Sequence, residues 1–129
     1  ETTLLGAARF RELARAGRER GQGVVLSVNL AMPWILDDVE PSADALLAGF
    51  STFFDAQFDV IAGVVAPHGR LPITLPASEA VIAVDAQGRC ASPNDVPGYA
   101  KQRHMPAGVT YAYTDADGHV YELGFGLTW

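Results

Sequence analysis

The chain has 129 residues, and its 9 Lys and Arg stand against 15 Asp and Glu for a formal net charge of −6, with 49% hydrophobic residues. This is the composition of an ordinary globular protein, and it excludes a collagenous, a disulfide-stapled or a strongly disordered chain. The length suits one domain over residues 1–129. The acidic balance gives no attraction to phosphate backbones or anionic lipids, so we expect neither nucleic acid nor a membrane as a partner.

Cys90 is the one cysteine of the sequence, which excludes an internal disulfide and a cysteine-based zinc site. A lone thiol fits reducing and oxidising compartments equally, so the localisation stays open. No apolar stretch approaches the roughly 18–20 residues that cross a bilayer. Because the first residue is Glu1 and not Met, we expect a processed product or a piece of a longer polypeptide.

The N-terminal segment has the pattern of an amphipathic helix. Apolar and small residues recur there at intervals of three and four, which predicts a helix over 3–19 capped by Thr2 or Thr3. Gly21 and Gly23 are expected to end it. The residues of the apolar face are Gly6, Ala7, Phe10, Leu13, Ala14 and Gly17.

Three further segments are expected to build the first half of the domain. Residues 24–30 are rich in Val and Leu on both faces, which suits a central strand of a covered parallel sheet. Residues 44–50 fit a short buried strand and a helix equally. A helix is predicted over 53–62, because Thr52 and Asp55 have the spacing of a capping box and apolar residues follow. These are Phe54, Phe58 and Ile61.

The second half is less regular. Residues 69–76 predict a constrained turn that runs into an extended segment bounded by prolines. Another strand is expected over 81–84, and residues 86–108 have the Gly and Pro content of a long loop. Alternating aromatic runs at 109–113 and 119–123 predict a β-hairpin.

Together these elements predict an α/β fold: a partial three-layer α/β sandwich with a mainly parallel sheet and a C-terminal β-hairpin extension. The chain enters on a helix, so the sheet is expected to lack its first strands.

Motifs for self-contained chemistry are absent from the sequence. It has no Gly-x-Ser-x-Gly elbow, no phosphate-binding Gly-x-x-x-x-Gly-Lys loop and no His-Glu-x-x-His. Residues 115–118, Asp-Ala-Asp-Gly, resemble the start of a calcium loop, but the further acidic ligands are missing, so we interpret them as a turn.

Other reactive residues also have ordinary explanations. Cys90 and His104 could form a nucleophile and base, but both fall in the loop-like segment without an orienting partner. His68, beside Gly69 and Arg70, could bind an anion, although a turn histidine is more often structural or exposed. An acidic cluster follows the first strand, and we interpret it as a solvated loop although glycoside cleavage uses paired carboxylates. Its members are Asp37, Asp38 and Glu40.

Two strings in the C-terminal half resemble the signatures of one known family. Residues 63–76 end in Pro67-His68-Gly69-Arg70-Leu71-Pro72-Ile73-Thr74-Leu75-Pro76, similar to Pro-Ser-Gly-Arg-Leu-Pro-x-Thr-x-Pro. Tyr111-Ala112-Tyr113 and then Tyr121-Glu122-Leu123-Gly124-Phe125-Gly126-Leu127-Thr128-Trp129 resemble a closing Tyr-x-Tyr and Phe-Gly-x-Gly-Leu-Ser-Tyr. Both signatures are those of the C-terminal α/β sandwich domain of family-3 glycoside hydrolases, the β-glucosidase-like enzymes.

The sequence departs from that family at three places. Residues 50–55 replace a Gly-rich, Glu-containing turn, His68 replaces the usual Ser, and Glu122-Leu123 replaces Pro-Phe or a similar pair. The family's nucleophilic Asp belongs to a preceding barrel domain, and its acid/base Glu lies earlier in the sandwich than Glu1. The resemblance therefore implies no catalytic residue, no metal site and no cofactor for this chain.

The function that this resemblance implies is a non-catalytic C-terminal portion of a β-glucosidase-like glycoside hydrolase, which completes the sandwich and walls the sugar cleft. The expected partners are a preceding catalytic barrel segment or another chain, with carbohydrate in the assembled enzyme and a homo-oligomer as a further expectation. The alternative is a stand-alone, non-catalytic binding or dimerisation module with the same fold.

One rim of the sheet is the expected place for substrate contacts. Ligands of open α/β sheets gather beyond the carboxyl ends of strands, where sugars meet an aromatic face and carboxylates. Trp34, Asp37 and Asp55 are the candidates, although a core Trp34 with surface aspartates explains them as well. Because an incomplete sheet leaves apolar surface, Phe50, Phe53 and Phe54 are expected at or near such a surface or in the core.

Overall fold

A computed structural model describes residues 6–82 and 107–128. In chain order these form α1 (Ala7–Arg18), β1 (Val25–Asn29), the short 3₁₀ helix η1 (Glu40–Ser42), β2 (Ala45–Gly49), α2 (Phe54–Ile61) and a second 3₁₀ turn, η2 (Glu79–Val81). The mixed helix and strand content confirms a small, partial α/β fold. No helix in these two ranges has the length and apolarity that a membrane span needs.

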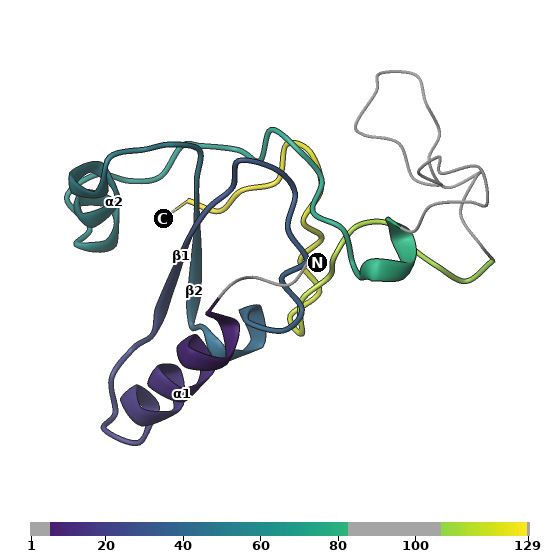
Figure 1. Cartoon of the computed structure of the whole chain (residues 1–129). Coiled ribbons are helices and arrows are strands. Elements are labelled where there is room, and N and C mark those ends of the chain that lie inside the picture. The colour runs from purple at the N-terminus through teal and green to yellow at the C-terminus, as the bar shows by residue number, and fades with distance from the viewer. Residues whose placement is uncertain (1–5, 83–106, 129) are drawn as a thin grey trace.

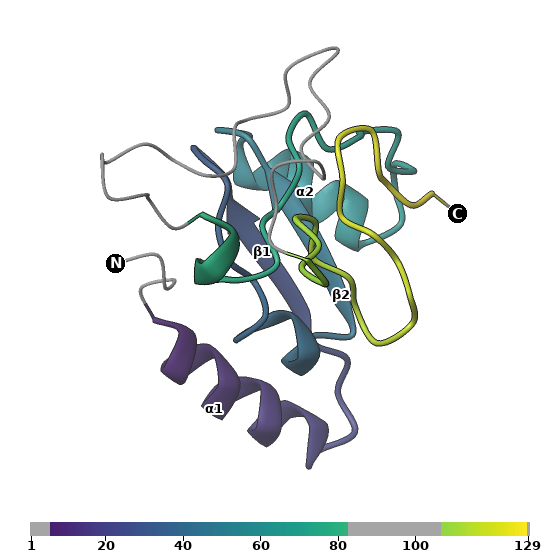
Figure 2. The same ribbon diagram turned by 90° about the vertical axis from the view of Figure 1, so that its right-hand side faces the viewer.

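The sheet consists of β1 and β2, which lie side by side and parallel (Figure 1, Figure 2). Val25 pairs with Ala45 and Asn29 with Gly49, so the segment that was ambiguous by periodicity is a strand. The pairing continues one residue past the end of β1, since the Leu30 N–H donates to the Gly49 carbonyl at 2.7 Å. Parallel pairing brings the carboxyl ends of both strands to one rim, as the sequence predicts.

The two faces of β1 have different neighbours. Leu26 and Val28 are buried and belong to the hydrophobic core, whereas Val25, Ser27 and Asn29 alternate with them and are exposed. Figure 1 shows α2 on one side of the two strands and the loop after β1 on the other, with the last residues of the chain running across towards α2. The strand alternation therefore assigns the core to the side opposite α2.

The core joins residues that are far apart in sequence. Ala7 of α1 and Leu36 and Val39 of the loop after β1 meet residues of the second half of the chain. These are Leu71, Leu75, Tyr113 and Tyr121. These four side chains, like Leu36 and Val39, come from segments outside any regular helix or strand, which are held in place by this packing.

Both helices end as the glycines predict. Gly63 follows α2 with φ 71, and the Val64 N–H returns to the Asp59 carbonyl at 2.8 Å. This is a Schellman ending, in which a residue without a Cβ occupies the left-handed conformation. The helix predicted over 53–62 is confirmed within one residue at each end.

Three local predictions are wrong. Gly6 has φ 90 and precedes the first turn of α1, so the helix begins at Ala7 and not at residue 3. Phe53, not Thr52, is the N-cap of α2 and no side chain caps it, so the capping box of Thr52 and Asp55 does not form. Val81 closes a 3₁₀ turn instead of opening a strand over 81–84, of which residues 83 and 84 lie outside the described residues.

The predicted β-hairpin is present in a reduced form. Thr114 and Val120 form an antiparallel bridge, and the Tyr121 N–H donates to the Tyr113 carbonyl at 2.9 Å. A second antiparallel bridge joins Ala112 to Pro76. The pairing is thus made of isolated bridges without continuous strands. Of the loop predicted over 86–108, only residues 107 and 108 are described.

Candidate functional site

The two strings singled out in the sequence lie against each other. The Leu71 N–H donates to the Phe125 carbonyl at 2.7 Å, and the Gly124 N–H returns to the Leu71 carbonyl at 2.8 Å. Further along, the Leu75 N–H donates to the Tyr121 carbonyl at 2.9 Å, and the Tyr113 N–H to the Leu75 carbonyl at 2.9 Å. The extended segment 71–76 is therefore held between the two arms of the hairpin.

Each of the two glycines of the closing string, Gly124 and Gly126, is favoured at its position for a different physical reason. Gly124 has φ 90, a backbone conformation that disfavours side chains. Gly126 lies so close to the 69–70 turn that a Cβ there would come within 2.6 Å of the Gly69 carbonyl oxygen. The Arg70 guanidinium also donates to the Gly126 carbonyl. Arg70 therefore ties the first string to the end of the second.

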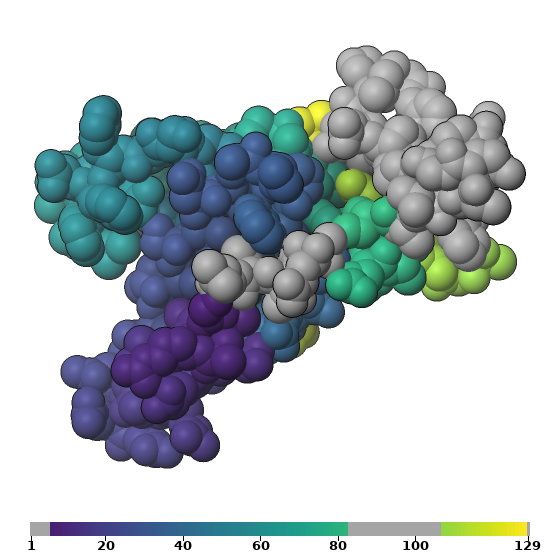
Figure 3. Space-filling model, in the orientation of Figure 1, coloured from purple at the N-terminus to yellow at the C-terminus, as the bar shows by residue number. Residues whose placement is uncertain are grey.

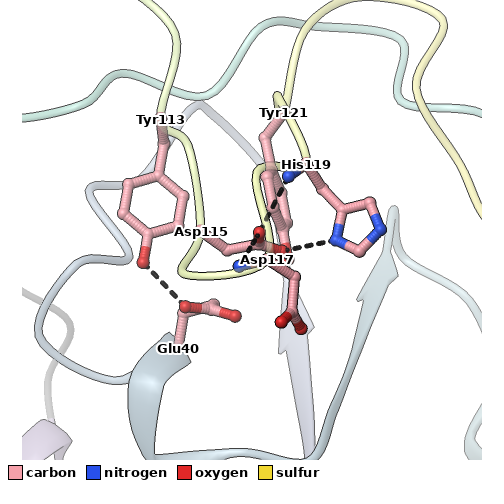
Figure 4. A network of polar contacts seen from close by, with 6 residues as sticks. All are labelled: Glu40, Tyr113, Asp115, Asp117, His119 and Tyr121. Atoms are coloured by element: carbon pink, nitrogen blue, oxygen red, sulfur yellow. Dashed lines mark hydrogen bonds and ion pairs between the residues drawn. The ribbon is translucent and has the colours of Figure 1, made fainter.

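Asp115 organises the turn of the hairpin (Figure 4). Its Oδ1 accepts the backbone N–H groups of Asp117 at 3.0 Å and His119 at 2.8 Å, and Gly118 takes φ 86. This is an Asx-type turn, which confirms the interpretation of residues 115–118 as a turn.

A polar network extends from this turn. Asp115 Oδ2 lies 2.9 Å from His119 Nδ1 and accepts the Tyr121 hydroxyl at 3.3 Å. Burial acts to raise the pKa of Asp115, but the hydrogen bonds from His119 and Tyr121 outweigh it, and the pKa is lowered. Asp115 is therefore an ionised acceptor at neutral pH.

The network reaches the first half of the chain through Glu40. The Tyr113 hydroxyl donates to Glu40 Oε2 at 2.7 Å, which ties the hairpin to η1 (Figure 4). The Tyr113 and Tyr121 rings meet edge to face with centroids 5.4 Å apart. Burial raises the pKa of both hydroxyls, and the carboxylates of Glu40 and Asp115 raise it further, so both tyrosines remain donors.

His119 has the most exposed ring of this network. Its side chain is 41% exposed and that of Asp115 is 9% exposed, so the carboxylate orients the imidazole from the protein side. With the proton on Nδ1, Nε2 is left as an acceptor. No group of metal-ligating side chains occurs among residues 6–82 and 107–128.

The rim candidates are placed separately in the structure. Trp34 is half-buried and packs against the core, and its indole N–H is buried without a hydrogen-bond partner among the described residues. Asp37 is exposed in the loop after β1, and Asp55 is exposed in the first turn of α2. In Figure 1 this loop runs from the end of β1 away from α2. The loop that holds Trp34 and Asp37 therefore leaves the shared rim on the side away from the helix that holds Asp55.

The acidic cluster after β1 is partly engaged in structural contacts. Asp38 forms an ion pair with Arg11 of α1, and Glu40 accepts the Tyr113 hydroxyl. Asp37 remains exposed. His68 is also exposed, while Cys90 and His104 lie outside the described residues.

Sequence reasoning missed two polar side chains that hold the elements together. Gln57 of α2 is 8% exposed and accepts the Ser27 hydroxyl of β1 at 2.6 Å. Asn29 Oδ1 accepts the Ser51 N–H at 2.8 Å, where Ser51 has φ 60. The sequence could have indicated the role of Gln57 only through the presence of a glutamine among the phenylalanines of a helix. The role of Asn29 could not be predicted, because its hydrogen bond joins residues 22 positions apart.

Comparison with known proteins gives a partial match. The chain is 36% identical over 63 residues to Beta-glucosidase C of Emericella nidulans. The matched stretch is 49% of this chain and 10% of that relative, so the chain spans about a tenth of the relative's length. No family model and no solved structure matches. The similarity links part of the chain to a glycosidase.

Proposed function

We propose that the chain is the non-catalytic C-terminal portion of the α/β sandwich domain of a family-3 glycoside hydrolase, where it completes the sandwich and walls the sugar cleft. The observation that carries this proposal is the 36% identity to a β-glucosidase. The interlocked strings support it, because Gly124 and Gly126 occupy positions that tolerate little else. Close packing between the two strings therefore explains why these glycines of the family signature are present in this chain.

The chemistry of the described carboxylates supports a non-catalytic role. A retaining glycosidase needs two carboxyl groups roughly 5–5.5 Å apart, of which one donates a proton and has a raised pKa. The pKa of Asp115 is lowered, and so is that of Asp44, whose carboxylate accepts the Val24 N–H and pairs with Arg18. Glu40 is engaged by Tyr113. Asp115 and Asp44 therefore lack the raised pKa of a general acid, and Glu40 is occupied by a structural hydrogen bond.

The test compares the 129-residue chain with the natural full-length polypeptide that contains it. Both are incubated with aryl β-glucosides, xylosides and N-acetylglucosaminides at mildly acidic and neutral pH. The longer polypeptide is expected to hydrolyse one of them and the chain alone none. Turnover by the purified chain that disappears in Asp37→Asn, Asp38→Asn or Asp55→Asn would contradict the proposal, as would an inactive full-length protein.

Carbohydrate contact at the rim is part of the same proposal. Asp37 in the loop after β1 and Asp55 in the first turn of α2 are exposed and would accept sugar hydroxyl hydrogen bonds, whereas Trp34 packs against the core and would only support the loop of Asp37. In the full-length enzyme, Asp37→Asn or Asp55→Asn should raise KM and leave the unfolding midpoint unchanged. An unaltered KM in both variants would show that the rim does not line the sugar cleft.

A second candidate is a stand-alone, non-catalytic module for binding or dimerisation. The observation that favours it is the exposed apolar surface around α2, which includes Phe53 and Phe54. A natural polypeptide of the same length as this chain, measured as an intact mass, would support this candidate over the first.

A further inference from the structure

The apolar stripe of α2 is exposed and lies beside the residue that contacts the sheet. Phe54, Phe58 and Ile61 are spaced i, i+4 and i+7 and so lie on one stripe of the helix. They are 75%, 63% and 44% exposed, while Gln57 beside them is buried. Figure 3 shows α2 in the teal lobe at the left end of the molecule. An amphipathic helix usually buries such a stripe, and this one has no covering element among residues 6–82 and 107–128.

Polar contacts explain why the helix is turned this way. Gln57 accepts the Ser27 hydroxyl of β1, and its amide N–H₂ donates to the Thr52 carbonyl at 3.4 Å. Gly49 of β2 leaves the room for this amide, since a Cβ there would lie 2.8 Å from Gln57 Nε2. The sheet therefore holds α2 by its polar side and leaves the aromatic side open.

The stripe and the other exposed apolar residues of the segment 50–65, which contains α2, are here called the phenylalanine patch. It comprises Phe50, Phe53, Phe54, Phe58, Ile61, Val64 and Val65. The four phenylalanines are 40–85% exposed, and at about 200 Å² per ring they leave on the order of 500 Å² of apolar surface. This is near the upper end of about 300–600 Å² for the largest patch on a monomer, before the aliphatic members are added.

That area matches what a symmetric dimer needs. A standard interface takes about 800 Å² from each partner, of which about 65% is apolar in homodimers, or about 500 Å². Asp55 and Asp59 are the charged residues of α2, and at 100° per residue they lie to the side of the stripe. A self-complementary contact would thus bury rings and leave the carboxylates at its edge.

We propose that the phenylalanine patch is a self-association surface, covered by the same patch of a second copy of this chain in a two-fold dimer. The two α2 helices pack stripe against stripe, and the four carboxylates of Asp55 and Asp59 stay in water at the rim. Their like charges oppose association, so added salt should strengthen the dimer. The inference rests on the exposed helix face, and it stands or falls separately from the glycosidase assignment.

The experiment is sedimentation velocity of the 129-residue chain over a concentration series at low and high salt. The wild-type chain is expected to shift from monomer to dimer and to do so at lower concentration in high salt. The double variant Phe54→Gln/Phe58→Gln removes the rings and keeps good helix formers, and its dimer Kd should rise at least tenfold. Leu13→Gln in α1 is the matched control, because Leu13 is 55% exposed, and its Kd should not change.

Circular dichroism checks that each variant is folded, and Phe53→Gln repeats the test if the double variant loses helical signal. A chain that stays monomeric at every concentration overturns the proposal. So does a Kd that is unaffected by the patch variants, a Kd that Leu13→Gln raises equally, or growth into species larger than a dimer.

Discussion

The Ser27 hydroxyl of β1 donates to the Gln57 side chain of α2 at 2.6 Å, and this bond joins the helix to the face of the sheet opposite the core. Gln57 is the buried residue of α2, in a helix whose phenylalanines are exposed. The orientation of the helix, and with it the position of the phenylalanine patch, follows from a polar contact.

Replacing this glutamine should loosen α2. Gln57→Ala removes the bond to Ser27 and the contacts above Gly49, and we expect a loss of about 1–2 kcal/mol in the free energy of unfolding. Urea denaturation measures it. Asp59→Ala, an exposed position of the same helix, is the control and should stay within about 0.5 kcal/mol of the wild type. Equal effects would show that α2 is not held by Gln57.

The close contact between the two strings predicts that adding one methyl group at Gly126 lowers the stability of the fold. In Gly126→Ala the new Cβ would lie 2.6 Å from the Gly69 carbonyl oxygen, a backbone atom that cannot move alone. We expect a loss of about 1–3 kcal/mol, as for overpacked cores. Gly23→Ala is the control, because a Cβ there meets nothing within 4 Å. An equally stable Gly126→Ala protein would contradict the close approach.

The Asp115 carboxylate predicts a pH-dependent contribution to stability. Its pKa is lowered in the folded chain, so its contribution is complete above the unfolded value of about 3.9 and is lost as the pH falls through the folded value. Asp115→Asn should therefore lower the free energy of unfolding by about 1 kcal/mol or more at neutral pH. The difference from wild type should shrink below about pH 4.

Denaturation curves at several pH values test this, with Asp117→Asn as the matched control. Asp117 is exposed and contributes only its backbone N–H to the turn, so its variant should follow the wild-type profile. A difference between Asp115→Asn and wild type that does not depend on pH would assign the loss to packing alone.

Two substitutions of Trp34 are predicted to differ in how much stability they cost. Trp34→Ala removes a ring that packs against the core and should cost roughly 2–3 kcal/mol of the free energy of unfolding, somewhat less than for a fully buried ring. Trp34→Phe keeps most of the ring and removes the buried, unpaired indole N–H, so it should cost less than about 1 kcal/mol. Thermal unfolding of both variants distinguishes a core residue from a purely surface one, for which both changes would be neutral.

The sequence by itself determined the elements whose signal is local. The helix before Gly21, the strand at 25–29 and the helix before Gly63 are confirmed, because periodicity and glycine punctuation act within a few residues. The Asp-Ala-Asp-Gly turn is confirmed for the same reason, since its hydrogen bonds join residues two and four apart.

Tertiary structure decided the features that depend on distant partners. Residues 45–49 form a strand because β1 pairs with them, and Val81 lies in a 3₁₀ turn although its local pattern favours a strand. The Tyr113 to Glu40 bond spans 73 residues. The exposure of Phe54 and Phe58 also depends on tertiary structure. A helical pattern predicts which residues share a stripe but not whether that stripe is buried, and here the sheet contacts α2 through the hydrogen bond between Ser27 and Gln57.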